Sequence, residues 1–108
     1  MKQKASGRIS PRPEDKVIIK RYPNSFLETE LDTYLKSLKI DTLVICGMIT
    51  HMCVDTTVRA AMDYGYQVKL VADACATMDL KLSGETIPAE MVHKVFISAL
   101  DGVFATIV

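Results

Sequence analysis

The chain has 108 residues, enough for one domain with a buried core. Lysine plus arginine and aspartate plus glutamate balance at 13 each, so no net field attracts nucleic acid or a membrane surface. No apolar run approaches the roughly 20 residues of a spanning helix, and the three cysteines form no C-x-x-C pair. The composition therefore predicts a cytoplasmic globular protein without disulfides, a zinc site, or a nucleic-acid or membrane partner.

The N-terminal part of the sequence divides into an arm and a first strand. Residues 1–16 are polar and contain glycine and prolines, which predicts an irregular arm before a single domain at 17–108. Residues 17–20 are β-branched up to a final lysine and predict a short strand. Residues 21–26 predict a loop, because Pro23 disfavours helix at the residue before it.

Three helices and three further strands follow in alternation. Apolar residues at helical spacing indicate the helices, and short apolar runs indicate the strands. The run at 42–46 lacks alternation, which is typical of a strand covered on both faces, so Cys46 is predicted to lie in the core. The predicted helices occupy residues 29–38, 53–64 and 88–101, the strands 42–46, 67–72 and 103–108, and a polar connection 79–85.

This alternating order predicts an α/β fold. We expect a parallel sheet of about four strands with three helices on its two faces, a Rossmann-like three-layer α/β/α arrangement. Ligands collect at the carboxyl ends of such strands. Lys20 ends the first predicted strand and the 47–53 loop leaves the second, so both are expected at that edge.

Cys53 is the strongest candidate for chemistry. It opens a helical run directly after a strand and Gly47. Free N–H groups and the helix dipole at such a position favour a thiolate, the reactive form of cysteine. The alternative is a buried structural thiol, and for Lys20 it is a solvated lysine at a strand end.

The assembled motifs resemble the isochorismatase-like cysteine hydrolase superfamily, from about Pro11 to the C-terminus. Family members hydrolyse C–N bonds of amides and ureides or, in isochorismatase itself, a vinyl ether. The amide-cleaving branch uses an Asp–Lys–Cys triad. The matching segments are VIIK at 17–20, NSF at 24–26, G-x-x-T-x-x-C-V at 47–54, RAA at 59–61, GY at 65–66 and DA at 73–74.

The resemblance implies roles for residues of this chain. Cys53 would be the nucleophile and Lys20 the cation that stabilises its thiolate. The backbone N–H groups of Ile49 and Cys53 would hold the oxyanion, beside a non-proline cis peptide at Met48–Ile49. Thr50 and His51 line the same loop; His51 is either a substrate contact or an exposed loop histidine. The substrate would be a small molecule, with no metal and no cofactor.

The sequence departs from the family pattern at its N-terminal side. The family aspartate lies in an Asp-x-Gln or Asp-x-Asn setting after the first strand, and neither occurs here. Lys20 corresponds to the third family strand, so two central strands have no counterpart. Direct closure of the sheet, a second copy of the chain (a homo-oligomer), or a longer product would each resolve this gap.

Two classes of function therefore remain open. One is a cysteine hydrolase of small amides or ureides that lacks the family aspartate. The other is a catalytically inactive, truncated member that serves as an assembly or binding domain. A third reading makes Cys53 a redox-sensing thiol.

Overall fold

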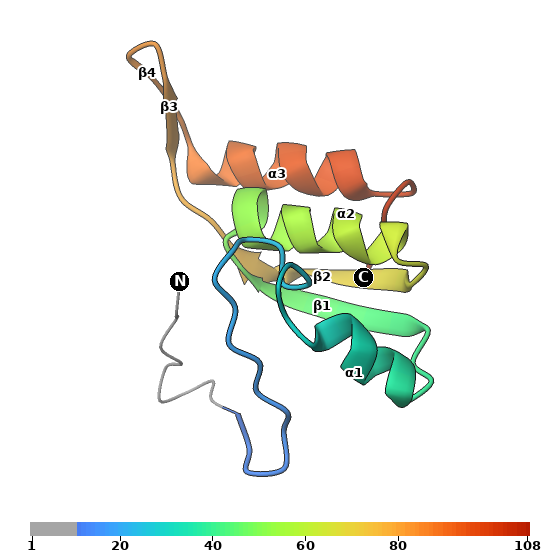
Figure 1. Cartoon of the computed structure of the whole chain (residues 1–108). Coiled ribbons are helices and arrows are strands. Elements are labelled where there is room, and N and C mark those ends of the chain that lie inside the picture. Colours follow the sequence, from blue (N-terminus) through green and yellow to red (C-terminus); the bar gives the residue numbers. More distant parts are fainter. Residues whose placement is uncertain (1–10) are drawn as a thin grey trace.

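The computed structural model describes residues 11–108, in which three parallel strands form the central sheet (Figure 1). The strands are β1 (Thr42–Met48), β2 (Gln67–Ala76) and β5 (Thr106–Ile107), in the spatial order β1-β2-β5. The β1–β2 register shifts after Ile45, so that Gly47 lies opposite Cys75. The strands predicted at 42–46 and 67–72 are present, and each extends further towards its carboxyl end.

Helical elements join these strands. They are α1 (Leu31–Ser37), the π-helical turn η1 (Thr50–Val54), α2 (Asp55–Asp63) and α3 (Ala89–Leu100). In Figure 1, α2 and α3 lie along one face of the sheet, and α1 lies on the other side of β1. The predicted α/β fold, a parallel sheet with three α-helices, is confirmed.

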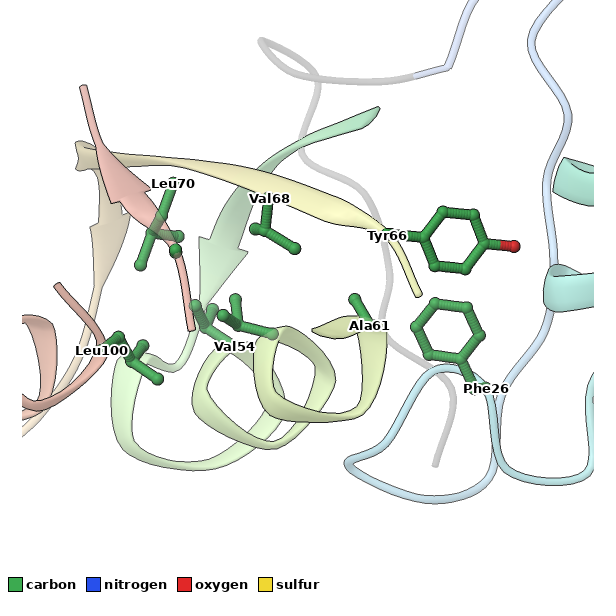
Figure 2. Close-up of a cluster of buried hydrophobic side chains, with 9 residues drawn as sticks. Phe26, Val54, Ala61, Tyr66, Val68, Leu70 and Leu100 are labelled. Carbon is green, nitrogen blue, oxygen red and sulfur yellow. The ribbon is translucent and has the colours of Figure 1, made fainter. Parts of the chain in front are cut away.

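The hydrophobic core lies between the sheet and α2 with α3. Val58, Leu70 and Leu100 are fully buried there. Phe26 reaches this cluster from the loop before α1 and packs against Tyr66 with ring centroids 5.9 Å apart (Figure 2). Burying an aromatic ring contributes several times the apolar area of a small side chain, so Phe26 anchors its loop to the domain.

The segment at 17–20 is not a strand, which corrects the prediction. Residues 17–20 are irregular and pair with no strand among the described residues. Val17 and Ile19 are 59% and 65% exposed. A β-branched sequence favours a strand only where a neighbour completes the hydrogen-bond ladder, and this segment has no neighbouring strand in the structure.

The polar connection predicted at 79–85 contains a β-hairpin instead. Strands β3 (Leu80–Leu82) and β4 (Glu85–Ile87) pair antiparallel across Ser83 and Gly84. Both turn residues have positive φ, 51° and 79°, as a two-residue type I′ turn requires. The hairpin projects beyond the sheet in Figure 1.

The final strand is shorter than predicted. The backbone N–H groups of Val103, Phe104 and Ala105 all donate to the carbonyl oxygen of Leu100 at the end of α3. These bonds close a turn, so pairing with β2 begins only at Thr106.

One face of β1 is open, which corrects the expectation that both faces are covered. Burial alternates along the strand, and Val44 and Met48 are 68% and 49% exposed. Cys46 lies between them on this face and is exposed, so its predicted place in the core is wrong. The cause is that α2 and α3 pack on the opposite face.

The described part of the predicted arm lies on the surface, with every residue exposed. Residues 11–16 include a turn in which Asp15 N–H donates to the Arg12 carbonyl, and residues 1–10 lie outside the described residues. Within residues 11–108, no helix has the length and apolar character needed to cross a membrane.

Candidate active site

Cys53 lies in the first turn of a helical run that begins three residues earlier than predicted. The π-helical turn η1 starts at Thr50 and continues directly into α2. Its geometry comes from Ile49, whose carbonyl oxygen accepts both the Met52 N–H (3.1 Å) and the Val54 N–H (3.3 Å). Cys53 is half-buried and sits where backbone N–H groups favour negative charge.

Lys20 meets Cys53 across 33 residues of sequence. Its Nζ donates to the Cys53 Sγ at 3.3 Å and to the Tyr22 carbonyl oxygen at 3.1 Å. An ammonium at this distance stabilises a thiolate by a charge-assisted hydrogen bond. The structure thus brings together the two side chains that the sequence analysis proposed as site residues. Lys20, however, lies on an irregular segment rather than at the end of a strand.

These two side chains share an open cleft of about 260 Å³. Polar groups from α2 and from the loop before α1 face apolar groups from the end of β1. Within the described residues, no aspartate or glutamate lines it. The lining residues are Lys20, Ser25, Ile45, Cys46, Gly47, Met48, Cys53, Val54 and Thr57.

The turn between β1 and Cys53 has unusual backbone geometry. Gly47 has φ +141°, outside the range that side chains normally allow, and the Met48–Ile49 peptide bond is cis. The cis bond lies at the position that the family resemblance implies. The use of the Ile49 and Cys53 N–H groups as an oxyanion site stays a prediction.

Thr50 and His51 do not line the cleft beside Cys53. Thr50 is fully buried; its Oγ1 donates to the Ala76 carbonyl oxygen (3.3 Å) and lies 2.9 Å from Nδ1 of His93 on α3. His51 Nδ1 lies 2.6 Å from the Thr77 hydroxyl, and its ring packs against Phe96. Both side chains therefore tie the turn to β2 and α3.

The other two cysteines have different surroundings. Burial raises the pKa of the Cys75 thiol, with a smaller rise from nearby Cys46 and an opposing hydrogen bond from the backbone of Gly47. The Cys75 Sγ donates to the Val71 carbonyl oxygen at 3.4 Å. Within the described residues, neither thiol has a hydrogen bond to a lysine or arginine, whereas Cys53 accepts one from Lys20.

The described residues offer no acid or metal cluster at this site. Asp15, the acid nearest to Lys20 on its N-terminal side, is bound by Arg12, whose guanidinium holds the pKa of that carboxyl below its usual value. It does not line the cleft. Across residues 11–108, no three His, Cys, Asp or Glu side chains gather in a way that could hold a metal ion.

Sequence reasoning missed two polar residues of the cleft, Ser25 and Thr57. Thr57 follows Cys53 by four residues, which places both on one face of the helical run. That spacing was a usable signal. Ser25 lies in the NSF segment that resembles the family, but its place in the cleft depends on how the loop packs against α2.

Comparisons with known proteins agree with this geometry. The profile of the isochorismatase domain matches residues 2–107. YddQ of Bacillus subtilis, an uncharacterized isochorismatase family protein, is 46% identical over 99 residues, which are 92% of this chain and 55% of YddQ. A streptothricin hydrolase of Streptomyces noursei is 34% identical over 86 residues, covering 77% of this chain and 31% of that enzyme.

The fold also matches that of a solved structure. An isochorismatase from Pseudomonas putida KT2440 has a TM-score of 0.92 and 38% identity, over 96% of this chain and 54% of that one. The chain therefore spans about half the length of both YddQ and this isochorismatase.

Proposed function

The chain belongs to the isochorismatase family, and from this premise we propose that it acts as a cysteine-nucleophile hydrolase of small amides or ureides that lacks the family aspartate. Cys53 is the nucleophile, and Lys20 is the cation that stabilises its thiolate. The relative named streptothricin hydrolase supports hydrolysis as the class of reaction.

The contact between Lys20 and Cys53 carries the proposal. A lysine Nζ 3.3 Å from a cysteine Sγ, in an open cleft at the first turn of a helix, is the arrangement that activates a thiol. A structural thiol needs neither a cation nor a cleft. Cys75 is such a thiol, half-buried and bonded to a carbonyl oxygen.

The reaction follows from this geometry in two stages. The Cys53 Sγ attacks the substrate carbonyl carbon, a C–S bond forms, and the C=O electron pair moves onto oxygen. Collapse restores the carbonyl and breaks the C–N bond, and the departing amine takes up a proton. Water then attacks the thioester, which releases the acid and returns the thiol.

Proton supply to the amine is the weak point of the described site. A general acid typically contributes about 10²–10⁴ in rate, and no carboxylate lines the cleft within residues 11–108. Leaving groups that need no proton should therefore react more readily than amines. An acid that completes the site would come from outside the described residues.

We also propose that the chain forms a homo-oligomer through β1. In the described sheet β1 pairs only with β2, and its open face carries Val44, Cys46 and Met48. An exposed apolar edge strand favours pairing with another chain.

Reaction with p-nitrophenyl acetate tests the hydrolase proposal. We expect a burst or slow turnover that Cys53→Ala abolishes and Cys75→Ala retains, with little hydrolysis of nicotinamide. Absence of any Cys53-dependent reaction would support the inactive binding domain instead. Efficient amide hydrolysis that requires Cys53 would show that an acid from another subunit completes the site.

A further inference from the structure

The position of Lys20 needs an explanation, because no β-ladder holds its segment. Residues 17–20 pair with no strand among the described residues. A lysine side chain also has many rotamers, and fixing it costs entropy. Contacts other than strand pairing must therefore hold the backbone near Lys20 against α2.

The loop that follows Lys20 is internally braced. The Phe26 N–H donates to the Asn24 side-chain oxygen (2.9 Å), and the Leu27 N–H donates to the Asn24 carbonyl (3.2 Å). The Thr29 hydroxyl donates to the Ser25 carbonyl at 2.6 Å. These bonds make the turn that begins at Asn24 a rigid unit, anchored at its far end by the buried ring of Phe26.

Thr57 attaches the near end of this unit to α2. Its side-chain oxygen lies 3.0 Å from the Ser25 backbone nitrogen, 3.1 Å from the Ser25 hydroxyl and 3.2 Å from the Pro23 carbonyl oxygen. Thr57 is only 9% exposed, so water does not readily replace these bonds. It also lies one helical turn after Cys53.

The hydrogen bonds around the Thr57 hydroxyl can be assigned by counting. A hydroxyl has one proton and two lone pairs. The Pro23 carbonyl oxygen can only accept a hydrogen bond, so the Thr57 O–H donates to it. The Ser25 N–H and O–H groups then donate to the two lone pairs of the Thr57 oxygen. All three contacts are then satisfied together, and the Thr57 hydroxyl has no capacity left for a substrate.

We propose that Thr57 is a positioning residue that holds Lys20 against Cys53 by fastening the Pro23–Ser25 turn to α2. Only Arg21 and Tyr22 separate Lys20 from this turn, and Pro23 restricts the backbone between them. Thr57 and Cys53 share one helix, so fixing the turn to Thr57 fixes the distance from Lys20 to the thiol. The inference rests on the proposed roles of Lys20 and Cys53.

The test is the rate of Cys53 alkylation by iodoacetamide at neutral pH, followed by peptide mapping. Thr57→Val removes the hydroxyl and keeps the shape; it should lower the rate at Cys53 about threefold. Thr57→Ser keeps the hydroxyl and should restore the wild-type rate. Ser25→Ala removes one of the three bonds and should give a smaller fall.

Combining variants separates positioning from a merely structural role. Thr57→Val should lower the melting temperature in either case, but only positioning through Lys20 predicts that it leaves the alkylation rate of Cys53 unchanged when Lys20 is already Met. An equal fall in rate in the wild-type and Lys20→Met backgrounds, or no fall in the wild type, would overturn the inference. If Lys20→Met alone leaves the rate unchanged, the proposed function itself fails.

Discussion

Replacing Lys20 with methionine should slow the reaction of Cys53 with an alkylating agent. The variant removes the ammonium 3.3 Å from Sγ and keeps an unbranched chain of similar length. At that distance Coulomb's law gives about 1.3 kcal/mol in bulk water and about 5 kcal/mol at an effective dielectric constant of 20. The cleft is open and Cys53 half-buried, so the interaction should lie towards the lower bound.

Measured hydrogen bonds to charged groups narrow this range. They contribute about 1.5–3 kcal/mol, equivalent to about a 10- to 100-fold change in the population of the charged form. The alkylation rate changes less than this population, because a more basic thiolate is also a better nucleophile. Lys20→Met should therefore lower the rate of Cys53 alkylation at neutral pH by about three- to tenfold.

The assay is iodoacetamide alkylation from acid to alkaline pH, with the Cys53 peptide quantified by mass spectrometry and its rate compared at neutral pH. Lys81→Met is a matched control, because Lys81 is exposed on the β3–β4 hairpin and its replacement changes net charge equally. Its rate should equal that of the wild type. If Lys20→Met and Lys81→Met react at the same rate, the contact between Lys20 and Cys53 has no electrostatic consequence and the reasoning is refuted.

Three further predictions follow from other parts of the structure. The hydrogen bond from Lys36 and, second to it, the one from Tyr66 lower the pKa of Asp32. The folding stability that these two bonds contribute is therefore fully present above the unfolded-state pKa of about 4, and it is lost as pH falls through the lower pKa of the folded state. Urea unfolding from about pH 5 to pH 2.5 should accordingly show a flatter decline for Asp32→Asn than for the wild type, and equal slopes would contradict this pairing. Burial raises the pKa of Cys75, so in the alkylation series its peptide should react at higher pH than an unfolded control, and equal reactivity would show that the thiol is not buried. Val44→Lys should weaken self-association and so lower the average mass that light scattering gives at micromolar concentration. Val95→Lys, at a similarly exposed valine on α3, should leave this mass unchanged. A monomeric wild type would exclude self-association through β1.

The sequence was most informative where local signals and packing agree. The apolar runs at 42–46 and 67–72 and the stripe of the last helix predicted β1, β2 and α3. Gly47 follows the first run, Gly65 precedes the second, and Pro88 and Gly102 flank the helix. Cys53 stood out because a strand and a glycine precede it. The structure places Lys20 beside it, at the carboxyl edge that the topology predicted.

The remaining features depend on neighbours that a linear pattern does not contain. Residues 17–20 have strand propensity but no strand beside them among residues 11–108. Cys46 faces outward because the helices cover the other face of β1. Ser83–Gly84 is a local signal for a two-residue hairpin turn, and the prediction of a polar connection at 79–85 does not include such a turn. The role of Thr57 could not be predicted from the sequence, because it depends on where the loop that contains Pro23 packs.

The identity of the residue that p-nitrophenyl acetate acylates tests the central claim most directly. The reaction is quenched in acid within the burst, and peptides are mapped for the added acetyl group. The account predicts acetylation concentrated on Cys53 in the wild type, strongly reduced in Lys20→Met and unchanged in Lys81→Met. Acetyl groups spread over surface lysines, or carried by Cys46 or Cys75 while Cys53 stays unmodified, would contradict it.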